Sequence, residues 1–410
     1  MVADTGPDIQ DAPLRVLVAG GGVAGLEAIL ALSDMAADRV DVTLLSPQDE
    51  FGYRPLAVAE PFSLGRVHRY PLSKLAKDLG VRLVRGTLER VDADQRLITT
   101  VDGEPLGFEA LLVATGARAE VAVQHALTWW PEGDPDVFGG LLRDLEQAYT
   151  HKVAFVVPPQ VAWPLPAYEL ALMTARQVES MGIDDAELTI VTPEAAPLGI
   201  FGRQAAEAVA AELAAANIEL VTGAYVERVQ AGRLEIQPGA RRLEVDRVVA
   251  LPRAAGPHVP GLPADDAGFI PTDAHARVVG VDGVWAAGDG TSFPIKQGGL
   301  AAQQADAAAA SIAALAGAGI APEPFRPVLR GVLMTGDAPQ FMSSDIAGGD
   351  GEGQASSRSL WWPPVKIAGR YLAPYLAARD PDLAVRVPDN RTSAAIDVEI
   401  EVGTQRAGAS

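Results

Sequence analysis

The 410-residue sequence predicts an α/β protein with two Rossmann-like domains and a C-terminal appendix. Three observations predict this fold class. An apolar strand, a glycine-rich turn and a helix follow one another over residues 15–35, and a second apolar strand follows at residues 40–46. The same order begins again at Lys152, and a segment rich in tryptophan and proline follows residue 320. The repeated order predicts two parallel sheets covered by helices.

Composition narrows the chemistry. Hydrophobic residues make up 48% of the chain and charged residues 21%, as in ordinary globular proteins. The sequence has no cysteine, which excludes disulfides, thiolate nucleophiles and iron–sulfur ligation, so any redox chemistry must reside in a bound cofactor. The net charge of −20 makes nucleic acid an unsuitable partner. The five histidines have no metal-ligand spacing, and we predict no metal site.

Neither a secretory signal nor a membrane span is expected. The first 15 residues are acidic and lack the basic, apolar and small-residue progression of a signal peptide. No window contains the roughly 20 apolar residues that cross a bilayer. The sequence therefore predicts a cytoplasmic protein, with peripheral membrane contact left open.

The first turn, Gly20-Gly21-Gly22-Val23-Ala24-Gly25, has the GxGxxG spacing of a dinucleotide-binding turn. We expect Gly20 to make the tight turn, Gly22 to admit a pyrophosphate and Gly25 to allow close packing of helix on strand. The helix N-terminus adds free N–H groups and a favourable dipole. The turn therefore predicts that this domain binds a dinucleotide, and the alternative is a glycine-rich turn without a ligand.

Two further strand ends belong to the expected site. The second strand ends at Ser46, where an acidic residue usually binds the adenosine ribose, so we expect a weaker contact from Ser46 or a substitute from Asp49 or Glu50. A later strand, within GVWAAGDGTSF, delivers Gly288 and Asp289. This segment resembles the second FAD motif of flavoproteins with two dinucleotide-binding domains, which implies that the Asp289 carboxylate accepts hydrogen bonds from a ribityl chain; the alternative is a helix cap.

In this order, GGGVAG, LLVATGA and AAGD resemble the FAD-binding motifs of the pyridine nucleotide-disulfide oxidoreductase superfamily. Within it, the chain is similar to the sulfide:quinone oxidoreductases, flavocytochrome c sulfide dehydrogenases and type II NADH dehydrogenases over about residues 13–315. Residues 51–55, 192–194 and 296–299 add to the resemblance. The resemblance implies a glutathione reductase-like fold with two dinucleotide-binding domains, and an FAD-dependent oxidoreductase.

The motifs and the resemblance together imply a set of FAD-binding residues. In the family, the segment from Lys296 to Gly298 abuts the flavin pyrimidine ring, where Lys296 would add positive charge; the alternative is a solvated loop lysine. The expected cofactor-binding residues are Gly20, Gly22, Val23, Ala24, Gly25, Ser46, Arg54, Pro55, Leu88, Ala114, Thr115, Gly116, Gly288, Asp289, Lys296, Gln297 and Gly298.

The departures from the family restrict the reaction. Sulfide oxidation in the relatives uses a cysteine pair beside the flavin, so that chemistry and disulfide reduction are excluded here. The second turn, residues 157–166, reads VPPQVAWPLP in place of GxGxxG, and proline removes the N–H donors that a pyrophosphate needs. NAD(P)H binding is therefore doubtful, although a bent nucleotide could use side chains or the helix start at Ala167.

The resemblance places Glu169 on a helix near the isoalloxazine. A buried carboxylate there would have a raised pKa and could pass protons to a quinone or to the flavin, and the alternative is a surface glutamate. We therefore predict that Glu169 and Lys296 are catalytic, and that electrons pass through FAD to a quinone, another small acceptor or a protein, with NAD(P)H as a candidate donor. The alternative function is a flavin-binding redox sensor or partner protein without NAD(P)H turnover.

The expected domain boundaries follow these motifs. We assign residues 1–120 and 252–320 to the FAD-binding domain, 121–251 to the second, NAD-binding-like domain, 321–380 to the appendix and 381–410 to a flexible tail.

The appendix segment SLWWPPVKIAGRYLAPYLAARD combines Trp361 and Trp362 with Lys366 and Arg370. These residue types favour a monotopic membrane contact, and a homodimer interface or a packed core segment are the alternatives.

Overall fold

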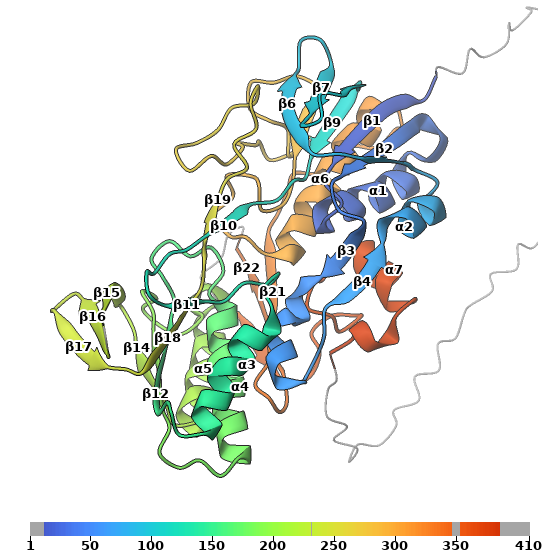
Figure 1. Ribbon diagram of the computed structural model, residues 1–410. Helices are drawn as coiled ribbons and strands as arrows, with labels where there is room; N and C mark the ends of the chain where they lie inside the picture. Colours follow the sequence, from blue (N-terminus) through green and yellow to red (C-terminus); the bar gives the residue numbers. More distant parts are fainter. Residues whose placement is uncertain (1–11, 231, 347–352, 386–410) are drawn as a thin grey trace, which may run out of the picture.

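The computed structural model describes residues 12–230, 232–346 and 353–385, which form two sheet-and-helix lobes and an appendix that contacts both (Figure 1). The α/β class predicted from the sequence is confirmed. The first lobe contains a five-stranded parallel sheet in the order β20-β9-β1-β2-β5. Its strands are β1 (Leu14–Ala19), β2 (Val40–Ser46), β5 (Arg82–Arg85), β9 (Ala110–Val113) and β20 (Val284–Ala286).

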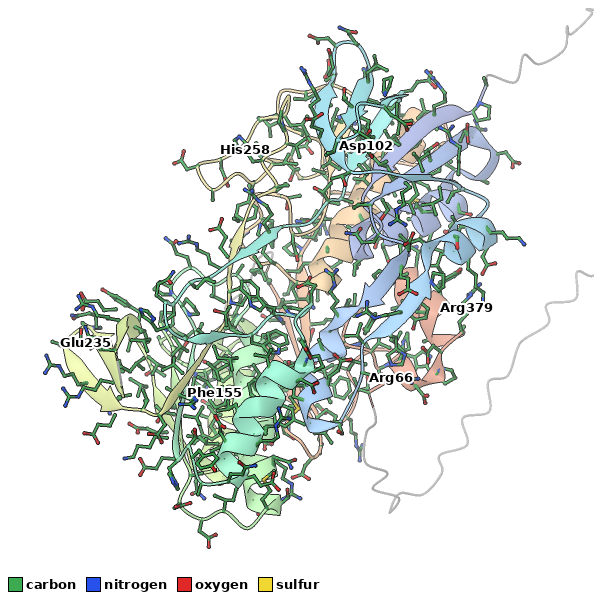
Figure 2. The ribbon with its side chains drawn as sticks, in the orientation of Figure 1. Arg66, Asp102, Phe155, Glu235, His258 and Arg379 are labelled. Carbon is green, nitrogen blue, oxygen red and sulfur yellow. The ribbon has the colours of Figure 1, made fainter. Side chains whose placement is uncertain are left out.

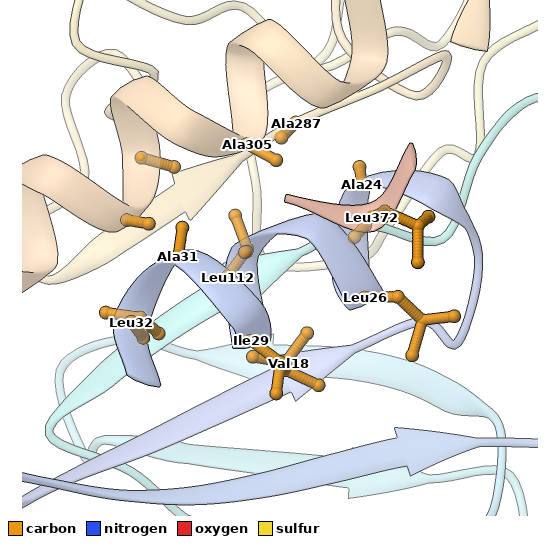
Figure 3. Packing of buried hydrophobic residues seen from close by; sticks show 14 of the residues in the cluster. Val18, Ala24, Leu26, Ile29, Ala31, Leu32, Leu112, Ala287, Ala305 and Leu372 are labelled. Carbon is orange, nitrogen blue, oxygen red and sulfur yellow. The ribbon is translucent and has the colours of Figure 1, made fainter. Parts of the chain in front are cut away.

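Helices α1 (Val23–Met35) and α6 (Gly298–Leu315) lie side by side on this sheet, although they are far apart in the sequence (Figure 3). Small side chains face each other between them, among them Ala24 and Ala31 on α1 and Ala305 on α6, all buried. Alanine lets two helices approach closely. This packing brings the Gly-Asp turn before α6 next to the glycine-rich turn before α1.

The second lobe repeats the arrangement with a parallel sheet in the order β11-β18-β12-β13-β14. Phe155 lies inside this lobe, fully buried, whereas Asp102 and Arg379 lie at the periphery of the molecule (Figure 2). The strands are β11 (Leu127–Thr128), β12 (Lys152–Val156), β13 (Glu187–Val191), β14 (Ile218–Val221) and β18 (Arg247–Ala250), and the helices are α3 (Pro135–Glu146), α4 (Leu165–Ser180) and α5 (Arg203–Ala215).

Short antiparallel sheets and single turns connect these layers. The paired strands are β3 (Glu50–Tyr53) with β4 (His68–Pro71), β6 (Leu88–Asp92) with β7 (Leu97–Thr100) and β8 (Pro105–Gly107), β10 (Arg118–Glu120) with β19 (Arg253–Ala255), and β15 (Tyr225–Gln230) with β16 (Arg233–Gln237) and β17 (Arg241–Glu244). Helix α2 (Leu72–Leu79) and the 3₁₀ segments η1 (Ala37–Arg39), η2 (Arg54–Phe62) and η3 (Gly199–Phe201) complete the two lobes.

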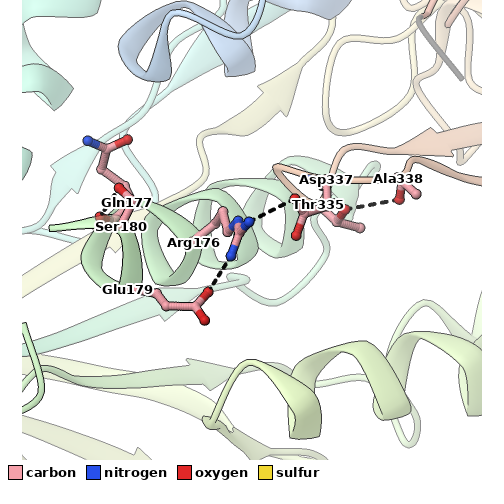
Figure 4. A network of polar contacts seen from close by, with 7 residues as sticks. All are labelled: Arg176, Gln177, Glu179, Ser180, Thr335, Asp337 and Ala338. Atoms are coloured by element: carbon pink, nitrogen blue, oxygen red, sulfur yellow. Dashed lines mark hydrogen bonds and ion pairs between the residues drawn. The ribbon is translucent and has the colours of Figure 1, made fainter. Parts of the chain in front are cut away.

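The appendix is tied to both lobes. It contains β21 (Val328–Leu333), β22 (Gln340–Asp345), β23 (Gln354–Ser356), α7 (Leu372–Ala377) and η4 (Pro381–Leu383). On the second lobe, Arg176 of α4 contacts Asp337 in the β21–β22 turn (3.2 Å) and Glu179 (2.6 Å), as Figure 4 shows. On the first lobe, Glu27 of α1 accepts the N–H groups of Tyr371 and Leu372 at the start of α7 (2.8 and 2.7 Å).

The segment predicted to be a flexible tail starts with ordered residues. Leu383 is fully buried, and Val385 is 7% exposed. Just before them, Asp380 bonds His68 (2.6 Å) and Tyr70 (3.0 Å) of β4, which anchors the end of the appendix. The rest of the predicted tail, residues 386–410, lies outside the described residues.

Candidate functional site

A cavity of about 440 Å³ lies where the two lobes and the appendix meet, within the size range of small-molecule and cofactor sites. The first lobe contributes the β1–α1 turn, the end of β9 and the β20–α6 loop. The second lobe contributes Trp163 and the first turn of α4, and the appendix contributes part of β21 together with Lys366 and Ile367. The cavity therefore collects segments from the whole length of the chain.

The β1–α1 turn requires glycine at position 20. Gly20 has φ +126°, and a Cβ there would overlap the carbonyl oxygen of Ala114. Gly22 is the N-cap of α1, and a Cβ there would meet nothing within 4 Å, so it would project into open cavity space. The first turn of α1 has no side-chain cap and no acidic residue. This helix start therefore keeps N–H groups available for an anion.

Most of the predicted cofactor residues line this cavity. Gly25 and Ser46 do not: Gly25 packs against the backbone of Gly20, and Ser46 is fully buried with its hydroxyl bonded to the Gln48 side chain (3.1 Å). The predicted site residues that line the cavity are Gly20, Gly22, Val23, Ala24, Arg54, Pro55, Leu88, Ala114, Thr115, Gly116, Glu169, Gly288, Asp289, Lys296, Gln297 and Gly298.

The end of β2 presents other polar groups than Ser46. Gln48 and Glu50 both line the cavity, and both are exposed. Asp49 is paired with Arg85 at the end of β5. Glu50 is therefore the carboxylate at this strand end that faces the cavity, in the region where a Rossmann domain binds ribose hydroxyls.

Asp289 and Lys296 are the two charged residues of the β20–α6 loop. Burial raises the pKa of Asp289 to about 6, although nearby Lys296 acts in the opposite sense. Burial lowers the pKa of Lys296 to about 8. The Lys296 ammonium donates to the carbonyls of Thr291 (2.5 Å) and Phe293 (2.6 Å) and lies 3.8 Å from the centre of the Phe269 ring. Lys296 is thus not a solvated loop lysine.

The residues after Lys296 shape the start of α6. Gln297 caps this helix by accepting the Leu300 N–H (2.9 Å), and its amide donates to the Arg330 carbonyl (3.1 Å). A Cβ on Gly298 would lie 2.8 Å from the Ile367 side chain. The helix start is therefore close to the appendix, with no room for a larger residue.

Glu169 lies on α4, in the part of the cavity wall that the second lobe contributes, and its side chain is 1% exposed. Lys366 donates to one carboxylate oxygen at 2.5 Å, and the backbone N–H of Met334 donates to the same oxygen at 2.9 Å. Burial raises the pKa of Glu169, although Lys366 and the Met334 N–H act in the opposite sense. The structure thus contradicts the surface-glutamate alternative.

The sequence left the segment of Lys366 open between membrane contact, a dimer interface and a packed core segment, and it gave no sign of a role at this site. The Lys366 side chain is 5% exposed and bonds Glu169. The strap, residues 360–367, carries Lys366. It is fixed because the Ile367 N–H donates to the buried Tyr53 hydroxyl (2.8 Å). Trp362 is 88% exposed, so only part of the tryptophan-rich segment faces solvent. Sequence spacing has no signal for a partner 197 positions away.

Comparison with known proteins identifies oxidoreductases that this chain resembles. Residues 167–310 match the family model described as "Pyridine nucleotide-disulphide oxidoreductase". A sulfide-quinone reductase of Aquifex aeolicus is 23% identical over 60% of this chain and 60% of its own length. A NADH dehydrogenase-like protein of Mycobacterium tuberculosis is 28% identical over 67% of this chain and 72% of its own length.

The solved structure of the Aquifex aeolicus sulfide:quinone oxidoreductase superposes with a TM-score of 0.76 at 19% identity, covering 84% of this chain and 87% of that one, which shows a common fold. Together these matches confirm the predicted resemblance to the superfamily and to its sulfide:quinone oxidoreductase and type II NADH dehydrogenase-like clade.

The family and these neighbours are FAD-binding oxidoreductases, and the matches support a flavin-dependent oxidoreductase of this type. The match to the Aquifex sulfide-quinone reductase spans less than two thirds of that relative's length. Among the described residues, no group of three or more histidine, aspartate or glutamate side chains could hold a metal ion.

Proposed function

We propose that this protein is an FAD-dependent oxidoreductase that passes electrons through its bound flavin to a quinone. One observation carries the proposal: a single cavity connects the glycine turn at Gly22 with the buried Glu169–Lys366 pair. The first feature suits the diphosphate of a dinucleotide, and the second suits proton-coupled chemistry.

The chain offers a group for each polar part of FAD. The N–H groups at the start of α1 would hold the diphosphate, because nothing caps them and Gly22 leaves space beside them. Asp289 lines the cavity, and its carboxylate accepts no hydrogen bond within the described part of the chain, so it is available to a ribityl hydroxyl. Glu50 would accept from the adenosine ribose in place of Ser46.

Bound FAD would supply a carrier that accepts two electrons and releases them one or two at a time. Reduction of a quinone to a quinol consumes two electrons and two protons. Glu169 is suited to holding one of these protons, because burial raises its pKa. Lys366, 2.5 Å away, would compensate its negative charge after the proton leaves.

Quinones dissolve in membranes, so peripheral membrane contact belongs to the proposal. No helix among the described residues is long and apolar enough to cross a bilayer. Trp362 is 88% exposed next to Leu360, which is 37% exposed. An interfacial tryptophan on an extended strap suits monotopic contact.

The test is an anaerobic stopped-flow experiment on the oxidative half-reaction. The FAD-loaded protein is reduced with one equivalent of dithionite and mixed with menadione, and the return of the oxidised-flavin absorption is followed. We expect rapid reoxidation and, for Glu169→Gln, a rate lower by about 10²-fold or more with unchanged flavin content. Glu179→Gln, on an exposed part of the same helix, is the control. Reoxidation of the wild-type protein no faster than that of free reduced FAD would refute the proposal.

A further inference from the structure

We infer that the second lobe excludes a nicotinamide dinucleotide, and that Glu194, Tyr168 and Trp163 are the residues responsible. The inference rests on the proposed function, since it concerns the electron donor of the same flavin site. It assigns a specificity to a lobe whose topology alone would suggest NAD(P)H binding.

The topology defines where a dinucleotide would bind in the second lobe. Strand β12, helix α4 and strand β13 form a βαβ unit with β12 and β13 paired in parallel. In such a unit the pyrophosphate lies at the first strand-to-helix turn, here residues 157–164, and an acidic group after the second strand binds the ribose hydroxyls. Glu194 is the acidic residue that follows β13 at the position nearest its end.

Glu194 already has partners inside the protein. The Tyr168 hydroxyl donates to its Oε2 at 2.6 Å, and the Thr192 hydroxyl donates to the same oxygen at 2.9 Å. Tyr168 and Thr192 are fully buried, and Glu194 is half-buried. A ribose diol would have to share the carboxylate with these two internal donors, and if it displaced Tyr168 it would leave a buried hydroxyl without its acceptor.

The turn itself offers fewer of the N–H donors that a pyrophosphate needs. Pro158 and Pro159 follow β12, Pro164 is the N-cap of α4 and Pro166 lies in its first turn. Proline has no N–H group. The starts of α1 and α4 both lack a side-chain cap, so the two turns differ in their residues: residues 20–25 contain no proline, whereas residues 158–166 contain four.

Trp163 closes the side of the cavity that this turn faces. Its indole lines the cavity and meets the Phe201 ring edge-on, with ring centres 5.8 Å apart. Phe201 is fully buried and fills the space beside Gly331 of β21, where a Cβ would lie 2.5 Å from its ring. Phe201 therefore supports the indole from one side. A nicotinamide that approached from the second lobe would meet this side chain.

Electrons would therefore enter from a donor that carries no adenosine dinucleotide. The test is an anaerobic titration of the FAD-loaded protein with NADH and then NADPH, with dithionite added last to show that the flavin is reducible. We expect no bleaching of the wild-type flavin by either nucleotide. Trp163→Ala combined with Tyr168→Phe, which opens the cavity wall and frees Glu194, should give measurable bleaching by NADH, at a rate about tenfold or more above the wild-type background.

Matched variants separate exclusion from general damage. Trp163→Phe keeps an aromatic wall and should behave as wild type, as should Tyr225→Phe on the exposed strand β15. Thr192→Val removes the second donor to the Glu194 carboxylate, together with the Oγ1 that accepts the Glu194 N–H (3.2 Å), and it replaces Tyr168→Phe if that variant does not retain flavin.

Each outcome decides the inference. Fast bleaching of the wild-type protein by NADH or NADPH would overturn it, and so would an opened variant that stays as unreactive as wild type, because these residues would then not be the barrier. Failure of the proposed function looks different: it appears in the menadione reaction of dithionite-reduced protein, which contains no nucleotide.

Discussion

The two strand-to-helix turns of this molecule have the same topology and opposite chemistry. The first, between β1 and α1, consists of small residues around Gly20 and Gly22 and leaves the helix start uncapped. The second, between β12 and α4, contains prolines and a large indole at Trp163. Both end at the same cavity. One turn is shaped to admit a ligand, and the other to form a wall.

The comparison shows that a Rossmann-like unit can keep its fold while its binding turn is used for packing. Strands β12 and β13 keep parallel register and a buried core, because the sheet depends on apolar side chains and not on the turn. The turn is free to vary because it lies at the sheet edge, outside the ladder. Topology therefore predicts the fold of the second lobe better than its ligand.

The largest expected effect follows from a side chain added to the first turn. Gly22→Val would fill the open space beside the α1 start and put a β-branched side chain where the diphosphate is proposed to lie. We expect colourless protein, measured as the ratio of flavin to protein absorption after purification. Pro159→Ala, a change at an exposed position of the second turn, should keep full flavin content. Equal flavin in both variants would remove the distinction between the turns.

The second-largest expected effect is a loss of stability when the Glu169–Lys366 pair, which joins the second lobe to the appendix, is broken. Lys366→Met would leave the buried Glu169 carboxylate without its counter-charge, which costs about 3–5 kcal/mol. Because the folded-state pKa of Glu169 is raised, protonation relieves this cost, so the loss of unfolding free energy should be larger at about pH 8 than at about pH 5.

Urea denaturation at the two pH values measures this difference. The double variant Lys366→Met, Glu169→Gln removes both charges and should recover most of the lost stability. A single variant that is as stable as the wild type would show that the pair is not a buried unit.

The sequence predicted the cavity wall well wherever the signal was local. GGGVAG, the end of β9 and the Gly288-Asp289 turn each combine a strand end with the residues that follow it, and a parallel sheet brings such ends to one edge. The contacts of Lys366 and Glu27 could not be predicted in this way, because their partners lie 197 and 345 positions away and depend on how the appendix folds back. Ser46 was misplaced because a strand pattern does not show which way its last side chain points.

A smaller effect is expected at Asp289. Asp289→Asn keeps the shape of the side chain but removes the negative charge, which would strengthen the hydrogen bond that the carboxylate accepts from a ribityl hydroxyl. The affinity for FAD should therefore fall by about 10–100-fold. The pKa of Asp289 is about 6, and an accepted hydrogen bond favours the ionised form, so the affinity of the wild-type apoprotein should rise from about pH 5 to about pH 7.

Fluorescence titration of apoprotein with FAD at several pH values tests both statements. The Asp289→Asn variant should show little of this pH dependence. An unchanged affinity in the variant would mean that Asp289 faces the cavity without contacting the cofactor.

The smallest effect on stability is expected at Trp362, although its effect on location should be clear. The side chain is 88% exposed and belongs to neither turn, so Trp362→Ser should change the free energy of unfolding by no more than about 0.5 kcal/mol. If the strap meets a bilayer, the same change should reduce co-flotation with phosphatidylcholine liposomes. Neutral lipid is chosen because the net charge of −20 would oppose an anionic surface.

Truncation of the appendix would be a poor substitute for this variant, since it would also remove β21 and Lys366 from the cavity wall. Wild-type protein that fails to float would exclude Trp362 as an anchor, and the quinone would then have to reach the cavity from solution. Flotation that survives Trp362→Ser would assign membrane contact to another surface. Either result would leave the contrast between the two turns unchanged, because the strap lies on neither of them.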